Sequence, residues 1–243
     1  MNADVDVAAY DRIAEWYDAW VGTQPMEEDP FFHEVEALMG DVAGQTVCDL
    51  ACGQGRGARR LADLGAHVLG VDISSRLLDI AHRYEARTPR WITYRQTDAR
   101  TCDGITGGAF DGVVCHMALM DIPDLEPTLH SVVRILRPGG WFVFAILHPC
   151  TNTPQSGETH SPGGWTRTIS SYFEEGFWRS DARTGPPGKV GAYHRTLGTY
   201  INALSDAGLT LECVSEPRLV GSHAERRPIW NEVPAAIIGR CRK

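Results

Sequence analysis

Short runs of β-forming residues alternate with longer segments of helical periodicity along most of this chain. Five runs precede residue 148, at 46–51, 67–73, 91–96, 110–116 and 141–147. The segments between them place apolar residues three and four positions apart, most clearly in the segment that follows Pro123. Such alternation builds a parallel sheet with helices on both faces, so the sequence predicts an α/β fold.

The regular alternation is interrupted after the fifth run. Residues 148–193 are rich in glycine, proline and aromatic side chains and show no persistent helical period. A loop of this length inside a compact domain is typically a lid or a binding element. A helix then begins near His194, and two strands follow at 209–216 and 232–243, the second of which we expect to be antiparallel.

These patterns predict one domain over residues 1–243. Its parts are an N-terminal helical cap, a cofactor-binding core, an acceptor-site insert and a closing helix with strands, at 1–44, 45–147, 148–193 and 194–243. Within the cap, 7–20 has helical spacing, and Asp29 followed by Pro30 is typical of a helix start.

Composition excludes several classes of function. The formal net charge is -8 and basic residues form no long runs, so we expect no nucleic-acid partner. No apolar window approaches the ~18 residues that cross a bilayer, and the N-terminus is acidic, so we expect a cytoplasmic protein without a membrane partner. We also expect a monomer or a homodimer. The seven cysteines form no CxxC pair, which indicates neither a zinc site nor a disulfide framework.

A glycine-rich loop follows the first predicted strand, in the stretch VCDLACGQGRGARR at residues 47–60. Gly53, Gly55 and Ala58 satisfy a loose dinucleotide-binding pattern, and Asp72 follows where an acid that binds ribose is expected. These residues alone are consistent with an NAD(P)-dependent oxidoreductase.

Asp49, at the end of the first strand, favours a different cofactor. A carboxylate there would repel a pyrophosphate. S-adenosylmethionine carries an ammonium and a sulfonium, which an acid attracts, and its ribose offers two hydroxyls to Asp72. The charge at this position therefore favours the methyl donor over a dinucleotide.

Five ordered motifs between about residues 45 and 148 resemble those of the class I S-adenosylmethionine-dependent methyltransferases, the bacterial small-molecule members in particular. They are Asp49–Arg56, Gly70–Ser74, Gln96–Ala99, Phe110–Asp111 and Leu136–Gly140. The resemblance implies a Rossmann-like three-layer sandwich, with a mostly parallel seven-stranded sheet whose last strand is antiparallel. It also implies S-adenosyl-L-methionine as cofactor and S-adenosyl-L-homocysteine as product.

The resemblance implies roles for individual residues. Gly53 and Gly55 let the backbone approach the methionine part, Asp49 faces the ammonium, and Asp72 binds the ribose. Asp98 with Ala99 meets the adenine, although Asp98 also suits a turn cap. The full set of expected cofactor-binding residues is Tyr17, Asp49, Ala51, Gly53, Gln54, Gly55, Arg56, Asp72, Ile73, Asp98, Ala99 and His116.

The acceptor site is expected between the N-terminal cap and the insert. A general base is needed only for an acceptor that must lose a proton, and histidine has a suitable pKa. We expect His148 first, and then His194, to fill that role. The expected acceptor-binding residues are Tyr10, Trp16, Met117, His148, Trp165, Tyr172 and Phe173.

The sequence thus predicts an enzyme that methylates an O or N atom of a small molecule, such as a natural-product or secondary-metabolite intermediate. Two alternatives remain at this stage: the oxidoreductase, and a protein of the same fold that binds S-adenosylmethionine without transferring its methyl group.

Overall fold

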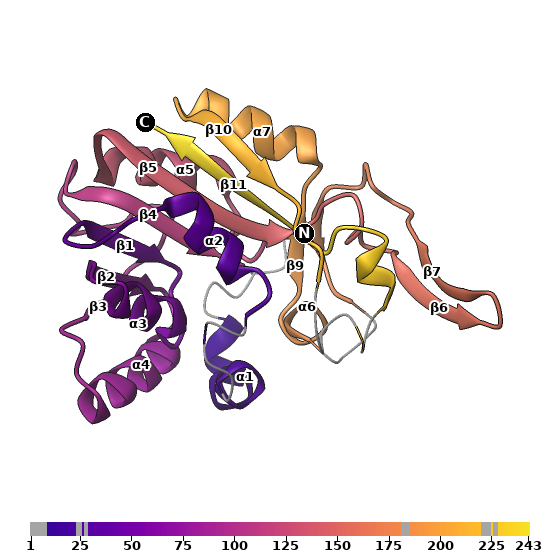
Figure 1. The fold of residues 1–243 in the computed structure, drawn as a ribbon, viewed down its shortest axis with the longest axis horizontal. Helices are drawn as coiled ribbons and strands as arrows, with labels where there is room; N and C mark the ends of the chain where they lie inside the picture. The colour runs from indigo at the N-terminus through magenta and orange to yellow at the C-terminus, as the bar shows by residue number, and fades with distance from the viewer. Residues whose placement is uncertain (1–8, 23–25, 27–28, 181–184, 220–224, 226–227) are drawn as a thin grey trace, which may run out of the picture.

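A seven-stranded sheet forms the centre of the computed structural model, which describes residues 9–22, 26, 29–180, 185–219, 225 and 228–243 (Figure 1). The strand order is β10-β11-β5-β4-β1-β2-β3. The strands are β1 Thr46–Leu50, β2 His67–Asp72, β3 Thr93–Gln96, β4 Phe110–His116, β5 Leu136–Leu147, β10 Thr210–Ser215 and β11 Ala236–Arg242.

The strand directions confirm the predicted architecture. β1 pairs in parallel with β2 and β4, and β4 pairs in parallel with β5. β11 runs antiparallel to both β5 and β10, as expected for the last strand. The order reverses beside β1, so a crevice is expected at the carboxyl ends of β1 and β4.

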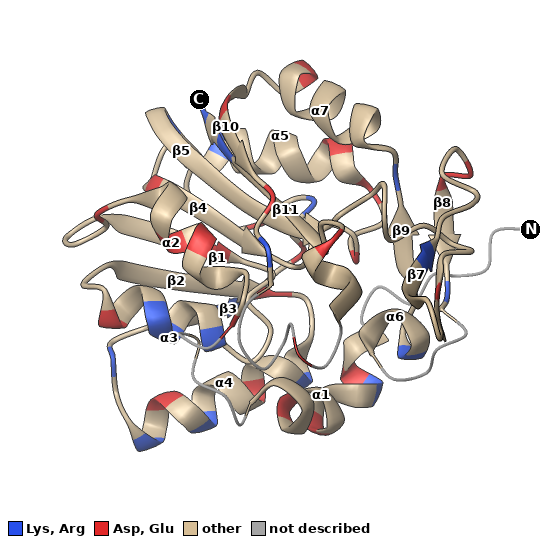
Figure 2. Ribbon diagram, turned by 45° about the vertical axis from the view of Figure 1, so that its right-hand side comes forward, with Lys and Arg blue, Asp and Glu red and all other residues tan. Residues whose placement is uncertain are grey.

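Helices cover both faces of the sheet, and each face has its own hydrophobic core. Leu129 and Tyr200 belong to the core on one face, whereas Phe32 and Leu61 belong to the core on the other. The helices are α2 Phe32–Met39, α3 Arg56–Asp63, α4 Ser75–Arg87, α5 Leu125–Ile135 and α7 Leu197–Asp206. Acidic and basic side chains are interspersed along α3 and α4 (Figure 2). None of the described helices has the length and apolar character to cross a membrane.

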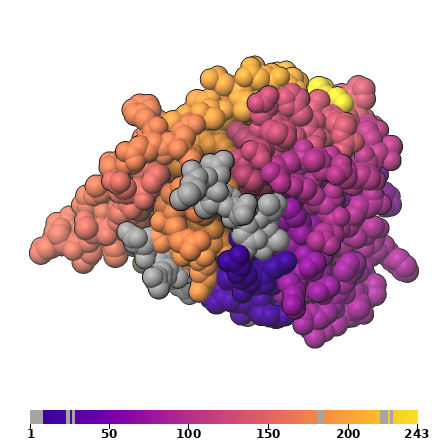
Figure 3. All heavy atoms as spheres, turned by 180° about the vertical axis from the view of Figure 1, so that it is seen from behind, coloured from indigo at the N-terminus to yellow at the C-terminus, as the bar shows by residue number. Residues whose placement is uncertain are grey.

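The N-terminal segment packs across α4. It comprises the 3-10 helix η1 Ala9–Ile13 and α1 Ala14–Val21, while residues 1–8 of the expected cap lie outside the described residues. The Tyr84 hydroxyl of α4 donates to the Asp18 carboxylate at 3.2 Å. Viewed from behind, the indigo N-terminal segment lies against purple and magenta residues of the predicted cofactor-binding core (Figure 3).

The insert contains more regular structure than the sequence predicted. Its strands are β6 Gly157–Ser161, β7 Gly164–Thr168 and β8 Gly176–Trp178; β6 pairs with β7, and β8 pairs with β9 Ala192–His194. The β6–β7 hairpin projects from the body of the molecule (Figures 1 and 3). Strands this short carry little periodicity, which explains why the pattern did not reveal them.

Several predicted boundaries are wrong by a few residues, including those of the last strand, which begins at Ala236 and not at residue 232. His194 ends β9 instead of beginning a helix, because Thr196 caps α7 by accepting a hydrogen bond from the Thr199 amide. β5 begins at Leu136 rather than at residue 141, since Gly139 and Gly140 pair with the backbone of the last residue. α2 begins at Phe32, two residues after Pro30, although Asp29 still accepts the Phe32 amide.

Gly112 of β4 provides a test of the packing between β4 and β5. A Cβ atom at Gly112 would overlap the ring of Trp141, its partner on β5. We expect Gly112→Ala to lower the free energy of unfolding by about 1–3 kcal/mol, because the buried ring has no room to move. Gly157→Ala, where a Cβ meets nothing within 4 Å, serves as the control and should change it by less than ~0.5 kcal/mol. Urea unfolding of both variants measures the difference, and equal stabilities would contradict this account.

Candidate functional site

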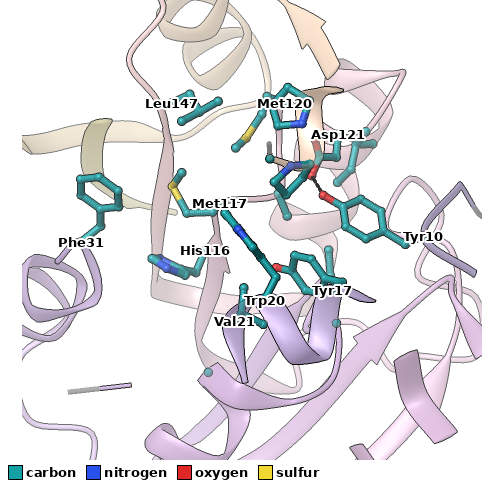
Figure 4. Close-up of a pocket in the computed structure, with 18 of the residues that line it drawn as sticks. Tyr10, Tyr17, Trp20, Val21, Phe31, His116, Met117, Met120, Asp121 and Leu147 are labelled. Carbon is teal, nitrogen blue, oxygen red and sulfur yellow. Dashed lines mark hydrogen bonds between the residues drawn. The ribbon is translucent and has the colours of Figure 1, made fainter. Parts of the chain in front are cut away.

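A cavity of about 930 Å³ lies at the carboxyl ends of the central strands (Figure 4). Its walls come from the N-terminal segment, the loops after β1, β2, β3 and β4, and the insert. Many predicted site residues line it together: Tyr10, Tyr17, Asp49, Ala51, Gly53, Gln54, Arg56, Asp72, Ile73, Asp98, Ala99, His116 and Met117. A cavity of this size and position is typical of a small-molecule site in an open α/β sheet.

The loop between β1 and α3 turns sharply through left-handed backbone conformations. Ala51, Gly53 and Gly55 have φ angles of 56°, 56° and 79°. Glycine adopts these angles without strain, and at Gly55 a Cβ would also overlap the Tyr94 hydroxyl. Ala51 has a Cβ and still adopts such an angle, a strain that is common at functional sites. The loop therefore brings bare backbone to the cavity wall.

Asp49 is buried at the end of β1 and only 3% exposed. Its Oδ2 has no hydrogen-bond partner among the described residues and would lie 3.0 Å from a Cβ at Gly57, at the start of α3. Burial raises the pKa of Asp49 to about 7, although the Ala58 amide acts in the opposite direction. A buried carboxylate with a free oxygen favours a cationic ligand, because an unpartnered polar group in the interior is costly.

Asp72 connects the end of β2 to the glycine loop. Its Oδ2 accepts the Gly53 amide at 2.8 Å and its Oδ1 accepts the Ser74 amide at 2.8 Å. Burial raises its pKa to about 6 despite these hydrogen bonds. Each oxygen retains a second lone pair, so Asp72 can also accept from ligand hydroxyls.

Asp98 lines the cavity and also orders a turn, so both expected roles agree with its position. Its Oδ1 accepts the Arg100 amide at 2.8 Å, and the Arg100 guanidinium lies 2.7 Å from Oδ2. Arg100 also pairs with Asp124 at 2.7 Å. Ala99 beside it is buried.

His116 and Arg56 both contact Asp29, which the sequence marked only as a helix start. His116 Nε2 lies 3.5 Å from Asp29 Oδ1, and Arg56 Nη1 lies 3.2 Å from Asp29 Oδ2. Burial acts to raise the pKa of Asp29, but His116 and the Phe31 amide outweigh it and hold this pKa below its ordinary value. All three side chains line the cavity.

Asp121, in the loop after β4, is a cavity residue that the sequence did not reveal. The Tyr10 hydroxyl donates to its Oδ2 at 2.8 Å (Figure 4). Burial and, to a lesser extent, the charge of Asp72 raise the pKa of Asp121 to about 7, although the hydrogen bond from Tyr10 acts in the opposite direction. The two residues of this hydrogen bond are 111 positions apart, so no local pattern indicated it.

Several expected acceptor residues lie outside this cavity. His148 Nε2 donates to Glu216 Oε1 at 2.6 Å, while its Nδ1 accepts the Cys150 amide. His194 lies in a smaller hollow and contacts the Tyr172 carbonyl. Trp16 stacks on Trp20. The other predicted residues outside the cavity lining are Gly55, Trp165, Tyr172 and Phe173, of which Phe173 is 86% exposed.

Other parts of the insert reach the cavity instead. Arg167 of β7 donates to the Thr151 carbonyl and to Ser156, and its guanidinium lies 4.9 Å from the centre of the Trp230 ring. Asn152, Ser156, Glu158, Arg167, Trp178 and Trp230 line this side. The aromatic content of the insert indicated a binding element, but only the folded hairpins determine which side chains turn inward.

The residues of this cavity fit S-adenosylmethionine. The free oxygen of buried Asp49 suits its ammonium, the glycine backbone admits its methionine chain, and Asp72 suits its ribose hydroxyls.

Comparisons with known proteins agree with this fit. Residues 48–144 match the model of a family described as "Methyltransferase domain". The chain is 33% identical over 153 residues to a protein from Albidiferax ferrireducens named ubiquinone biosynthesis O-methyltransferase, a match that covers 61% of this chain and 60% of that protein. A protein of the same name from Aromatoleum aromaticum is 28% identical, with 61% and 65% covered. The chain therefore spans only about three fifths of the length of these curated relatives.

Two solved structures match over more of the chain. An S-adenosylmethionine-dependent methyltransferase from Mesorhizobium loti is 29% identical with a TM-score of 0.76, and the match covers 89% of this chain and 99% of the other. A structure from Listeria monocytogenes, described as a putative methyltransferase of this kind, is 27% identical with a TM-score of 0.73, and 88% and 98% are covered. The chain thus carries a methyltransferase domain match at residues 48–144 and is similar, over most of its length, to S-adenosylmethionine-dependent methyltransferases, whose class I, Rossmann-like sheet topology it shares.

Proposed function

We propose that this protein transfers a methyl group from S-adenosylmethionine to an O or N atom of a small-molecule acceptor. The observation that carries this proposal is that one cavity is lined both by the residues that suit the donor and by residues of the insert. A single cavity of this kind has room to align donor and acceptor with each other, as an in-line displacement requires.

When bound, S-adenosylmethionine supplies an electrophilic methyl group on a positively charged sulfur. The residues of the chain bind and orient this donor: Asp49 holds its ammonium, and Asp72 holds its ribose while it fixes the Gly53 amide. Because positive charge disperses during the transfer, alignment and exclusion of water are the main contributions of the protein.

The N-terminal segment and the insert exclude water together. The Lys189 ammonium of α6 (Pro186–Lys189) lies 4.4 Å from the centre of the Trp16 ring of α1. Trp16 in turn stacks on Trp20, which lines the cavity. Trp16 thus connects the N-terminal segment with the insert, although its own side chain does not line the cavity.

The acceptor that we propose is a mid-sized, partly aromatic metabolite, such as an intermediate of natural-product biosynthesis. Tyr17, Trp20, Trp178 and Trp230 give the cavity flat apolar surfaces. The curated relatives, named for ubiquinone biosynthesis, carry names consistent with an aromatic acceptor.

Two other functions are less consistent with the cavity. Asp49 would repel the pyrophosphate of NAD(P) from the glycine loop. A protein that binds S-adenosylmethionine without methyl transfer has no need of the acceptor-side lining from the insert. Mass spectrometry of candidate acceptors for the gain of one methyl group separates this last case from the proposal.

Replacement of Asp49 tests the donor site. We expect Asp49→Asn to weaken the affinity for S-adenosylmethionine by at least about tenfold, because the amide no longer neutralises the ammonium. Asp63→Asn, at a surface ion pair with Arg90, is the control and should leave the affinity unchanged. Calorimetry with S-adenosylmethionine and NADH measures both; binding of NADH with tolerance of Asp49→Asn would instead support the oxidoreductase.

The affinity for S-adenosylhomocysteine should depend on pH. In the free protein the pKa of Asp49 is raised to about 7 and that of Asp72 to about 6, so both carboxyls become neutral as the pH falls through this range. A ligand with an ammonium binds the ionised form, so we expect about tenfold weaker binding at pH 6 than at pH 8. Calorimetry at the two pH values measures this change, which Asp49→Asn should reduce. A flat profile would contradict the assignment of Asp49.

Replacement of His148 tests whether this residue is a general base or has a structural role. Because both ring nitrogens already have protein partners, we expect His148→Ala to lower the free energy of unfolding by about 1–3 kcal/mol. We expect unchanged affinity for S-adenosylhomocysteine, measured by calorimetry. Once an acceptor is known, a lost acidic limb in the pH profile of kcat would restore His148 as the general base.

A further inference from the structure

We infer that the acceptor is an amine and that Asp121 binds its nitrogen. This inference rests on the proposed methyl transfer and narrows the O or N acceptor to nitrogen. It follows from the distribution of charge around the cavity and from the surroundings of Asp121.

Each arginine that lines the cavity, among the residues that the structure describes, is already paired with a carboxylate. Arg56 pairs with Asp29, Arg100 with Asp98, and Arg167 with Glu158. Among the described acidic residues of the lining, this leaves three without an arginine: Asp49, Asp72 and Asp121. The first two suit the ammonium and the ribose of the donor, so the negative charge of Asp121 is the one that remains for the acceptor.

Asp121 is presented on a fixed loop. Arg195 is buried and donates to the carbonyls of Leu119, Ile122 and Pro123 on either side of it, at 3.1, 2.7 and 2.7 Å. The same loop begins at Met117, which lines the cavity and has a φ of 54°. Such support on both sides is typical of a residue whose position matters for binding.

The surroundings of the Asp121 carboxylate suit a cation. Its Oδ2 accepts from the neutral Tyr10 hydroxyl, and no described residue donates to Oδ1. The Tyr10 and Tyr17 ring centres are 5.1 Å apart, and Trp20 follows at 6.3 Å from Tyr17. Figure 4 shows the Tyr10 hydroxyl directed at Asp121, with Tyr17 and Trp20 below them in that view. A carboxylate beside aromatic rings is a recurrent binding site for ammonium groups.

In the same arrangement, Asp121 can accept the proton that the acceptor ammonium must lose before methyl transfer. The acceptor ammonium gives one proton to the Asp121 carboxylate, and the freed lone pair of nitrogen then forms the new N–C bond. The C–S bond of the donor breaks as this bond forms, and its electron pair stays on sulfur. The raised pKa of Asp121, about 7, makes it a competent acceptor of that proton near neutrality.

Matched probes test the inference on protein saturated with S-adenosylhomocysteine. Tyramine and tyrosol share one skeleton and differ in an amine against a hydroxyl. By calorimetry at pH 8 we expect the wild-type protein to bind tyramine at least about tenfold more tightly than tyrosol. Asp121→Asn should abolish this preference and change the affinity for S-adenosylhomocysteine by less than about threefold.

The control is Asp63→Asn, which removes a carboxylate outside the cavity that pairs with Arg90, and it should keep the preference for tyramine. Equal affinities of the wild-type protein for the two probes, including no binding of either, would overturn the inference without any variant. Loss of S-adenosylhomocysteine affinity in Asp121→Asn would also overturn it, because Asp121 would then serve the donor. If the wild-type protein binds no S-adenosylhomocysteine, the proposed function itself fails.

Discussion

The Asp72 carboxylate is the interaction on which the rest of the site depends. By accepting the amides of Gly53 and Ser74, it fixes the glycine loop after β1 and the start of α4 with one side chain. The Ser74 hydroxyl then caps the Leu77 amide and contacts Asp11 of the N-terminal segment at 2.5 Å. A continuous set of hydrogen bonds thus runs from the end of β2 to the N-terminal segment.

Buried acids make this site costly for the folded protein. The unfolded chain releases protons from such carboxyls near pH 3.8, whereas burial raises the pKa of Asp49 and Asp121 to about 7 and that of Asp72 to about 6. The folded state therefore holds more protons between these values, and its stability falls as the pH rises through that range. A cationic ligand offsets this cost, so binding and stability are linked at the same three residues.

The donor half of the site could be predicted from sequence because it is built from strand ends. Asp49 and Asp72 stand where two β-forming runs stop, and the carboxyl ends of parallel strands meet at one edge of a sheet. The acceptor half depends on contacts that no periodicity encodes. Tyr10 reaches Asp121 across 111 positions, and His148 is drawn to Glu216 across 68, which turns an expected base away from the cavity.

The N-terminal segment contacts both halves of the cavity through adjacent residues. Tyr10 donates to Asp121 on the acceptor side, and Asp11 accepts from Ser74 on the donor side. Neighbours in the chain cannot move apart, so displacement of η1 breaks both contacts in one event. Asp121 after β4 and Ser74 at the start of α4 are therefore coupled to each other through η1.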